Sequence, residues 1–314
     1  MSENPSSPSP EEASTSTQPP RPSALLIWIA ALRPKTLGAA IAPVMIGSAM
    51  AFSEGLGHLP TALAALIAAL LIQIGTNFAN DYFDFVKGTD TEERLGPRRA
   101  TASGWVAPET MKQAYQWTFG AAMLVGVYLV YQGGFPILLI GLLSIAAGIA
   151  YTGGPFPLAY NGLGDVFVLI FFGPVAVGGS YYVQTQEMSV SLLLAGLGPG
   201  LIATALLAVN NLRDADTDAQ TNKRTLAVLF GKDFARFEYV LCISFAFMMP
   251  LLLVMESGRY WLSLLALLAL LPARTPLSQI ILRREGVALN ETLALTGKLL
   301  LIYSLLFSVG LLLS

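Results

Sequence analysis

The sequence predicts an all-α integral membrane protein, a helical bundle of about nine transmembrane helices. Of its 314 residues, 54% are hydrophobic and only 12% are charged, whereas roughly 25% of the residues of an ordinary soluble domain are charged. A helix that crosses a bilayer needs about 20 mostly apolar residues, and apolar runs of this kind recur along nearly the whole chain. This composition predicts one membrane domain, residues 23–314, with no soluble domain attached.

Residues 1–22 form a segment of a different kind. They are rich in Ser, Thr, Pro and Glu and contain no apolar run, a composition typical of disordered segments. Acidic residues come first in this segment, whereas a signal peptide begins with basic residues ahead of an apolar core. We therefore expect residues 1–22 to be a disordered N-terminal tail and not a signal peptide.

Gly, Pro and charged residues divide the membrane domain into candidate spans. A short apolar stretch, residues 23–32, precedes Arg33 and suits an interfacial helix that leads into the first span. The nine predicted spans lie near residues 37–53, 60–80, 112–131, 136–152, 165–183, 190–209, 237–255, 260–280 and 291–313.

The basic residues predict how these spans are oriented. Cytoplasmic loops of membrane proteins carry an excess of Lys and Arg. With nine spans, 17 of the 18 Lys and Arg residues fall on one face and only Arg259 falls on the other. We therefore expect the N-terminus on the cytoplasmic side and, because the number of spans is odd, the C-terminus on the opposite side.

Acidic residues gather at the ends of the second and sixth spans, on the face that carries the basic residues. If the helices continue through them, Asn80 and Asp84 share one helix face, and Asp214 and Asp218 share another. Carboxylates crowded near the membrane are costly unless they are paired or metal-bound. Oxygen ligands suit Mg²⁺, which proteins hold with one or two carboxylates plus substrate phosphates. The predicted Mg²⁺ ligands are Asn80, Asp81, Asp84, Asp90, Asp214 and Asp218.

The roles of individual acids stay open at this point. Asp90 lies further into its loop, where an acid can simply be solvated, and any single Asp can serve as a counter-charge for the basic residues of its face. The two clusters also repeat, because Asn80 and Asp214 are 134 positions apart, as are Asp84 and Asp218. This spacing favours an internal pseudo-repeat in which the second and sixth spans correspond.

Basic and aromatic residues beside the acidic clusters are candidates for substrate binding. Arg binds phosphate in bidentate fashion and Lys acts as a point charge, so both can stabilise a leaving diphosphate. Basic loop residues also serve membrane topology alone, and tyrosines are common at membrane interfaces. The candidate substrate-binding residues are Lys35, Lys87, Arg94, Tyr151, Lys223 and Arg224, and the candidate catalytic residues are Lys35, Asp84 and Asp214.

Four passages of the chain resemble the UbiA superfamily of intramembrane aromatic prenyltransferases. They are Leu32-Arg33-Pro34-Lys35-Thr36-Leu37, Asn80-Asp81-Tyr82-Phe83-Asp84 with Lys87-Gly88-Thr89-Asp90, Tyr151-Thr152-Gly153-Gly154-Pro155, and Asn210-Asn211-Leu212-Arg213-Asp214 with Lys223-Arg224-Thr225-Leu226. The resemblance covers nearly the whole chain after the tail. It implies nine helices with two Asp-rich motifs on the cytoplasmic side. The superfamily pattern places a further Asp four residues beyond Asp84, where this chain has Gly88, and Asp90 is the candidate substitute.

Within the superfamily the chain is similar to the branch that prenylates 1,4-dihydroxy-2-naphthoate in menaquinone biosynthesis. The resemblance implies that Mg²⁺ binds the carboxylates and a polyprenyl diphosphate, that the allylic C–O bond ionises, and that the aromatic ring attacks the resulting cation. It also implies release of CO₂ and diphosphate, giving demethylmenaquinone. The implied partners are the two substrates and the lipid bilayer of a bacterial inner membrane, with no nucleic acid.

Other functions remain open on the sequence alone. The alternative acceptors are 4-hydroxybenzoate, homogentisate or a tetrapyrrole, and a phytyl donor would give a phylloquinone precursor. An ion-coupled transporter also carries acids in membrane helices, but near the middle of the bilayer. Here the acids lie at helix ends and continue into basic loops, as a diphosphate site requires. A structural membrane protein would have no use for paired acids at this spacing.

Overall fold

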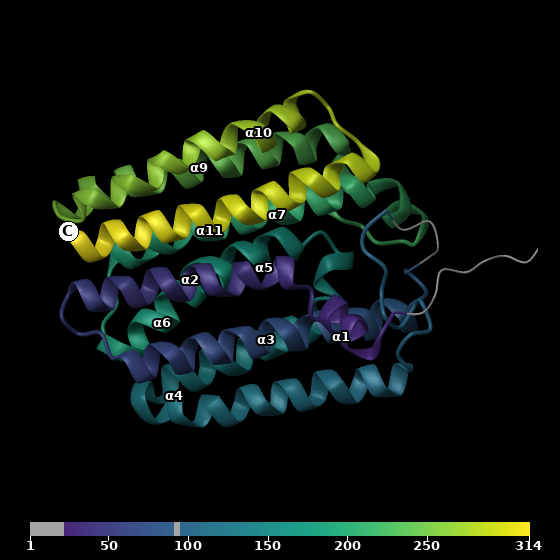
Figure 1. Cartoon of the computed structure of the whole chain (residues 1–314), viewed down its shortest axis with the longest axis horizontal. Helices are drawn as coiled ribbons and strands as arrows, with labels where there is room; N and C mark the ends of the chain where they lie inside the picture. Colours follow the sequence, from purple (N-terminus) through teal and green to yellow (C-terminus); the bar gives the residue numbers. More distant parts are fainter. Residues whose placement is uncertain (1–21, 91–94) are drawn as a thin grey trace, which may run out of the picture.

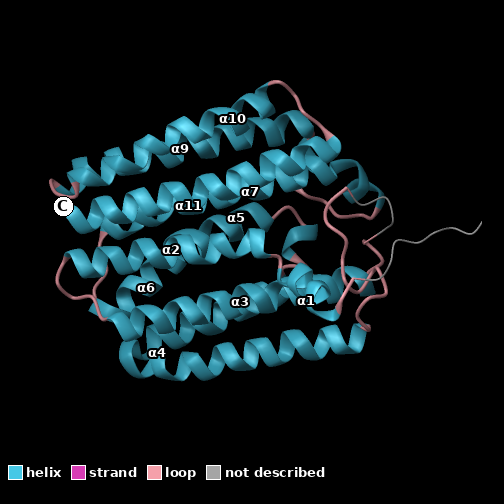
Figure 2. Cartoon of the chain, in the orientation of Figure 1, coloured by secondary structure: helices cyan, strands magenta, loops and turns pink. Residues whose placement is uncertain are grey.

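The structure, a computed structural model, describes residues 22–90 and 95–314. Every regular element within these ranges is helical, and the long helices run side by side in one bundle (Figures 1 and 2). The predicted tail therefore falls outside the described residues, apart from Pro22. The all-α membrane bundle expected from the sequence is confirmed.

The helices follow the predicted spans closely. Residues 23–32 were expected to form a short leading helix, and α1 occupies almost the same residues. The elements are α1 Ala24–Leu32, α2 Pro34–Ser53, α3 Leu59–Val86, α4 Pro108–Ala150, η1 Leu158–Tyr160, α5 Gly164–Ile170, η2 Phe171–Val175, α6 Ala176–Thr185, α7 Val190–Gln220, α8 Leu226–Phe230, α9 Lys232–Ser257, η3 Trp261–Ala269, α10 Leu270–Ile281, η4 Gly286–Ala288 and α11 Leu289–Leu313.

Eight continuous helical segments of the described chain are long and apolar enough to cross a membrane. One of them, α4, has 43 residues and contains non-helical backbone at Gly134. At about 1.5 Å per residue a straight helix of that length would be twice as long as the bilayer core is thick. The two arms of α4 match the predicted spans 112–131 and 136–152, so the eight segments supply nine crossings.

The reversal of α4 depends on a backbone conformation that only glycine adopts easily. Gly134 has φ 69° and ψ −157°, a region where other residues are strained by about 1–3 kcal/mol. We expect Gly134→Ala to lower the thermal unfolding midpoint in detergent. Gly120→Ala is the matched control, because a Cβ at Gly120 meets nothing within 4 Å. Equal midpoints for the two variants would contradict this account of the reversal.

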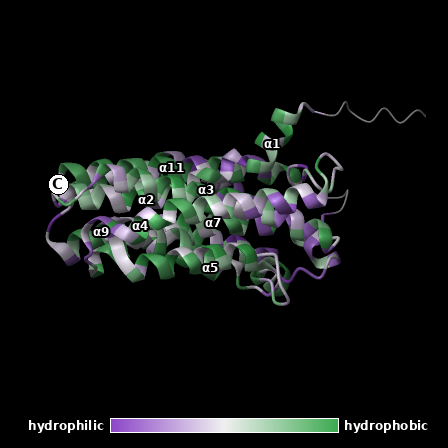
Figure 3. Ribbon diagram, turned by 90° about the horizontal axis from the view of Figure 1, so that it is seen from below, coloured by the Kyte–Doolittle hydropathy of each residue, from purple (hydrophilic) through white to green (hydrophobic). Residues whose placement is uncertain are grey.

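The polar loops collect at one end of the bundle. The segments between α3 and α4, between α4 and α5, and around α8 all lie at the end where α1 stands (Figures 1 and 3). The last helix, α11, ends at the other end, where the C-terminus is marked in Figure 1. The acidic ends of α3 and α7 therefore lie at the loop-rich end.

Close helix contacts hold the middle of the bundle, where small residues let backbones approach. At the bend in η2, a Cβ added to Gly173 would lie 2.9 Å from the backbone oxygen of Gly196 in α7, and one added to Gly200 would lie 2.7 Å from the backbone oxygen of Leu169. A side chain at either position would push the two helices apart. This contact fixes α5 and α6 against α7.

A single carboxylate joins three segments at the end opposite the polar loops. Glu54, which follows α2, accepts hydrogen bonds from the hydroxyls of Tyr181 in α6 and Tyr260 before η3. The guanidinium of Arg259 lies 4.0 Å from the same carboxylate. Burial raises the pKa of the Tyr260 hydroxyl, and the hydrogen bond to Glu54 adds to this effect. We call Glu54, Tyr181 and Tyr260 the Glu54 clasp.

Candidate active site

A cavity of about 660 Å³ lies among the helices of the bundle. Most of its wall is apolar and comes from α2, α3, α4, α5, α6 and α7. Its polar residues gather where these helices reach the loop-rich end. They include Arg33, Asn77, Asn80, Asp84, Arg99, Tyr151, Thr152, Asp165, Asn210, Asn211, Lys223 and Thr225. The cavity therefore has two parts. We call its apolar part the apolar chamber, and we call its polar end at the loop-rich end of the bundle, which includes Asp84, Arg99 and Lys223, the charged pole.

The first acidic cluster lies on the last turns of α3. The helix continues to Val86, so Asn80 and Asp84 share one face, as predicted. The Asp84 carboxylate accepts one hydrogen bond from Arg99 Nη2 at 2.7 Å and another from the Tyr160 hydroxyl at 2.9 Å. Asn80 Oδ1 accepts a hydrogen bond from the Thr152 hydroxyl at 2.9 Å. These contacts fasten two loops, the α3–α4 loop with Arg99 and the α4–α5 segment with Thr152 and Tyr160, to the end of α3.

Arg99 links two acids of this cluster. Its Nε lies 3.3 Å from Asp90 Oδ2, while its Nη2 contacts Asp84. The side chain of Asp90 is only 2% exposed, so the interpretation of Asp90 as a solvated loop acid was wrong. The sequence did not distinguish Arg99 from its exposed neighbour Arg98, because only the folded loop shows which of the two points inward.

Asp81 has a different environment from its neighbours. Its two carboxylate oxygens accept the backbone N–H groups of Ala100 and Thr101, each at 3.0 Å. Asp81 is buried and holds the loop that carries Arg99. These hydrogen bonds favour a structural role, and its assignment as a metal ligand stays a prediction.

The second acidic cluster lies on the last turns of α7, which continues to Gln220 and places Asp214 and Asp218 on one face. Arg213 binds both oxygens of Asp214, at 2.7 and 2.6 Å. Lys223 Nζ lies 3.2 Å from Asp218 Oδ1. Asp216 points away from the cluster and pairs with exposed Lys232, as its position on the helix predicts.

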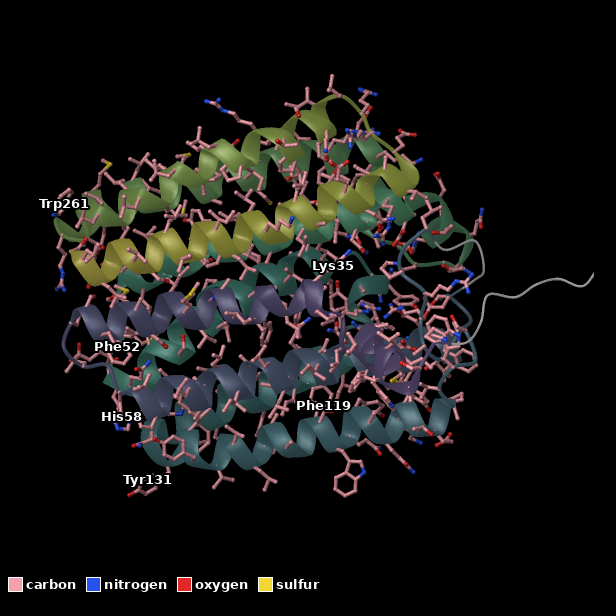
Figure 4. All side chains as sticks on the ribbon, viewed as in Figure 1. Lys35, Phe52, His58, Phe119, Tyr131 and Trp261 are labelled. Carbon is pink, nitrogen blue, oxygen red and sulfur yellow. The ribbon has the colours of Figure 1, made fainter. Side chains whose placement is uncertain are left out.

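The predicted basic residues differ in how they approach this charged pole. Lys223 lines the cavity, and Lys87 Nζ donates to the carbonyl oxygen of Thr152 at 2.6 Å. Desolvation lowers the pKa of Lys87, and the charge of Asp84 offsets part of that change. Lys35 is exposed at the start of α2 (Figure 4). Arg94 lies outside the described residues.

Arg224 is exposed, but its loop is tied to the site. Its backbone N–H donates to the carbonyl oxygen of Tyr160 at 3.2 Å, while the Lys87 ammonium lies 4.7 Å from the centre of the Tyr160 ring. Tyr160 therefore contacts the loops that follow both acidic clusters. Burial raises the pKa of the Tyr160 hydroxyl, and the charge of Asp84 raises it further, so Tyr160 stays a proton donor to Asp84.

Asp165 and Asn211 are among the polar residues of the cavity that were not predicted from the sequence. Asp165 opens α5 and is only 4% exposed, and Asn211 faces it from α7, with its amide nitrogen 3.5 Å from Asp165 Oδ1. A signal existed, since an ionisable residue at the start of an apolar span marks a candidate functional site. Tyr151, which was predicted, lines the same part of the cavity. Its pKa is raised by burial first and by the Asp165 charge second.

The donor set at the charged pole fits Mg²⁺. The described residues contain no group of three or more His, Cys, Asp or Glu side chains that would hold a metal by themselves. Mg²⁺, however, usually takes one or two carboxylates and completes its shell with water and phosphate oxygens. Such oxygens come from Asn80, Asp84 and Asp218. Positive charge already lies beside two of these carboxylates, because Arg99 contacts Asp84 and Lys223 contacts Asp218.

Comparison with known proteins gives consistent results. A 1,4-dihydroxy-2-naphthoate octaprenyltransferase of Escherichia coli (strain K12) is 39% identical over 91% of this chain and 95% of that protein. A protein of the same name from Haemophilus influenzae is 36% identical, over 92% of this chain and 96% of its own length. The corresponding protein of Mycobacterium tuberculosis is 34% identical, over 88% and 94%.

Solved structures share the fold. A UbiA homolog from Archaeoglobus fulgidus bound to GPP and Mg²⁺ superposes with a TM-score of 0.65 at 12% identity, over 92% of this chain and 100% of that one. The apo structure of a UbiA homolog from Aeropyrum pernix K1 superposes with a TM-score of 0.68 at 16% identity, over 88% and 98%. The profile of the UbiA prenyltransferase family matches residues 40–311. With almost the whole membrane domain matched, this chain belongs to the UbiA prenyltransferase family.

Proposed function

We propose that the protein transfers a polyprenyl chain from polyprenyl diphosphate to 1,4-dihydroxy-2-naphthoate, with loss of CO₂ and diphosphate, in the formation of demethylmenaquinone. The observation that carries this proposal is the cavity itself, because its apolar chamber ends at a pole where Asp84, Arg99 and Lys223 meet. The chamber suits an isoprenoid tail, since each buried methylene group is stabilised by about 0.8 kcal/mol. The charged pole suits a diphosphate. The names of the relatives, at 34–39% identity, support the naphthoate acceptor.

Mg²⁺ is the proposed cofactor, held by Asn80 and Asp84 from α3 and by Asp214 and Asp218 from α7, with Asp90 nearby. When bound, it draws negative charge off the departing diphosphate. Solved UbiA homologs bound to Mg²⁺ and a prenyl diphosphate support this choice. Both oxygens of Asp214 are already bound by a single side chain, that of Arg213.

The basic side chains at the charged pole are proposed to bind the diphosphate. Arg99 and Lys223 each bind a carboxylate and also line the cavity. Charge-assisted hydrogen bonds to a diphosphate are strong and directional, so we propose that both side chains turn toward the diphosphate as it binds. Lys35, Lys87, Arg94 and Arg224 surround the pole as further candidate donors. Tyr151 is proposed to contact the substrate where the chamber meets the pole.

The proposed location is the bacterial inner membrane, with the N-terminus and the charged pole on the cytoplasmic side. The excess of Lys and Arg at the loop-rich end supports this orientation. A cytoplasmic pole also gives a soluble naphthoate direct access, while the prenyl chain enters from the lipid. The C-terminus then lies on the opposite side.

The test is a direct assay with purified protein in detergent. It supplies Mg²⁺, a polyprenyl diphosphate and, in turn, 1,4-dihydroxy-2-naphthoate, 4-hydroxybenzoate or homogentisate, and it follows CO₂, diphosphate and product mass. We expect CO₂ and diphosphate to be released in equal amounts with the naphthoate alone. Turnover of hydroxybenzoate without turnover of the naphthoate would contradict the acceptor. Failure with every acceptor would contradict the enzyme itself.

A further inference from the structure

Asp165 is a buried carboxylate that the proposed reaction has not yet used. It lines the cavity and is 4% exposed. In the described part of the chain one side-chain donor reaches it, the amide of Asn211, at the long distance of 3.5 Å. The backbone N–H of Asp165 itself is a second donor, and a buried carboxylate without a charged partner is costly in free energy.

The other acids of the site are engaged by strong partners. Asp84 contacts Arg99, Asp214 contacts Arg213 and Asp218 contacts Lys223, all within 3.2 Å. In each of these pairs a guanidinium or ammonium group occupies a carboxylate oxygen and compensates its charge. Asp165 makes no ion pair within the described residues. It is therefore the cavity carboxylate best able to accept a proton.

The depth of Asp165 also suits the reacting atoms. It contacts α7 at Asn211, three residues before Asp214, which corresponds to about 4–5 Å toward the apolar chamber. The allylic carbon of a bound prenyl diphosphate must lie there, because the diphosphate occupies the charged pole and the tail occupies the chamber. Asp165 therefore lies near the boundary where the new C–C bond forms.

Tyr151 lies near Asp165 in the lining of the cavity, and Glu238 of α9 lies near Asp165 outside that lining. A Cβ added to the adjacent Gly164 would lie 3.2 Å from the Tyr151 hydroxyl. Because burial keeps this hydroxyl protonated, Tyr151 and Asn211 present hydrogen-bond donors beside a single acceptor. Such a set distinguishes the two polar groups of a hydroxynaphthoate: the ionised ring carboxylate is repelled by Asp165, whereas a ring hydroxyl can donate to it.

We propose that Asp165 is a catalytic residue of the proposed reaction, accepting the proton of the ring hydroxyl adjacent to the carbon that is prenylated and later returning it. The inference rests on the proposed function, since it needs an acceptor that carries both a hydroxyl and a carboxylate. It also assigns an orientation, with the ring hydroxyl toward Asp165 and the ring carboxylate toward the basic side chains.

The atoms and electrons balance in two steps. In the first, the allylic C–O bond breaks with its electron pair leaving on diphosphate, the ring carbon that bears the carboxylate bonds to the allylic carbon, and the hydroxyl proton passes to Asp165 as the oxygen becomes a carbonyl. In the second, the C–CO₂ bond breaks and its electron pair restores the aromatic ring. The oxygen then takes back the proton from Asp165. No oxidant is needed, and the immediate product is the quinol.

The test compares Asp165→Asn with Glu256→Gln. Glu256 is the control, because it is an exposed carboxylate at the far end of α9 that does not line the cavity. Asn keeps the shape of Asp but cannot accept the proton, so we expect prenylated product to form about 10²-fold more slowly or worse. Binding of the polyprenyl diphosphate and its thermal stabilisation of the protein should be unchanged. Glu256→Gln should retain the wild-type rate.

Formate or azide added to Asp165→Ala, which leaves room for a small anion, should restore part of the rate of that variant, which a purely structural role would not allow. Equal rates for Asp165→Asn and wild type would overturn the inference, as would a loss of activity with loss of donor binding and no rescue. If Asp165→Asn does not fold, Asp165→Glu tests the inference instead. This variant keeps a carboxylate and should retain most of the wild-type rate. A loss of rate as large as that expected for Asp165→Asn would overturn the inference. Failure of the wild-type protein to release CO₂ from the naphthoate would instead contradict the proposed function.

Discussion

Replacing Asp84 with Asn is expected to lower the turnover of polyprenyl diphosphate by about 10³-fold, the upper end of effects seen when one preorganised electrostatic group is removed. Asp84 lies where α3, the Arg99 loop and Tyr160 meet. The substitution removes a proposed Mg²⁺ ligand without removing volume. Arg99 keeps its contact with Asp90, so the loop should stay in place. Turnover is measured as diphosphate release at saturating Mg²⁺.

The matched control for this variant is Asp216→Asn. Asp216 is on the same face of the bundle and also forms an ion pair, but its side chain is 78% exposed. It should leave turnover unchanged. Both variants should keep the thermal unfolding midpoint of the wild type within a few degrees. An active Asp84→Asn protein would remove Asp84 from the proposed metal site, whatever the control shows.

Replacing Arg99 with Ala is expected to destabilise the protein by about 3–5 kcal/mol, the usual cost of removing one partner of a buried ion pair. The side chains of Arg99 and Asp84 are each 6% exposed, and Asp90 is more buried still. Without Arg99 two carboxylates face each other with less positive charge nearby. Added Mg²⁺ should therefore raise the thermal midpoint of Arg99→Ala more than that of wild type.

Arg98→Ala is the control for the Arg99 variant, because Arg98 is its exposed neighbour. Its thermal midpoint and its response to Mg²⁺ should match those of the wild type. Thermal unfolding in detergent, measured with and without Mg²⁺, separates the two variants. A Mg²⁺ response of equal size in all three proteins would show that the cation does not replace the charge of Arg99.

Much of the fold follows from the sequence because the bilayer restricts the possible structures. Apolar length predicts the spans, and the sequence Gly133-Gly134 separates the two arms of α4 even though no polar loop does. Helix ends are harder to predict. The second span was predicted to end near residue 80, and the helix that contains it, α3, continues to Val86. Its polar last turns are stabilised by loops that fold over them, which a local apolar pattern does not reveal.

The candidate site was predicted in outline, because acids at helix ends are conspicuous in an apolar chain. Asp84 and Lys223 line the cavity, and Asp216 faces away as its helical position requires. Arg99 was missed and the burial of Asp90 was left open, since the burial of both depends on how the loop folds back. Asp165 was missed because a single acid at the start of an apolar span resembles a helix-capping residue.

The two ends of the bundle differ in how their segments are connected, and the Glu54 clasp lies at one of them. At the clasp, one carboxylate binds two tyrosines from separate segments, and the connections between helices are short. At the charged pole, the helix ends are joined by long loops whose contacts are ion pairs that a diphosphate can exchange. The clasp therefore cross-links α2, α6 and the segment before η3 at the end of the bundle away from the charged pole.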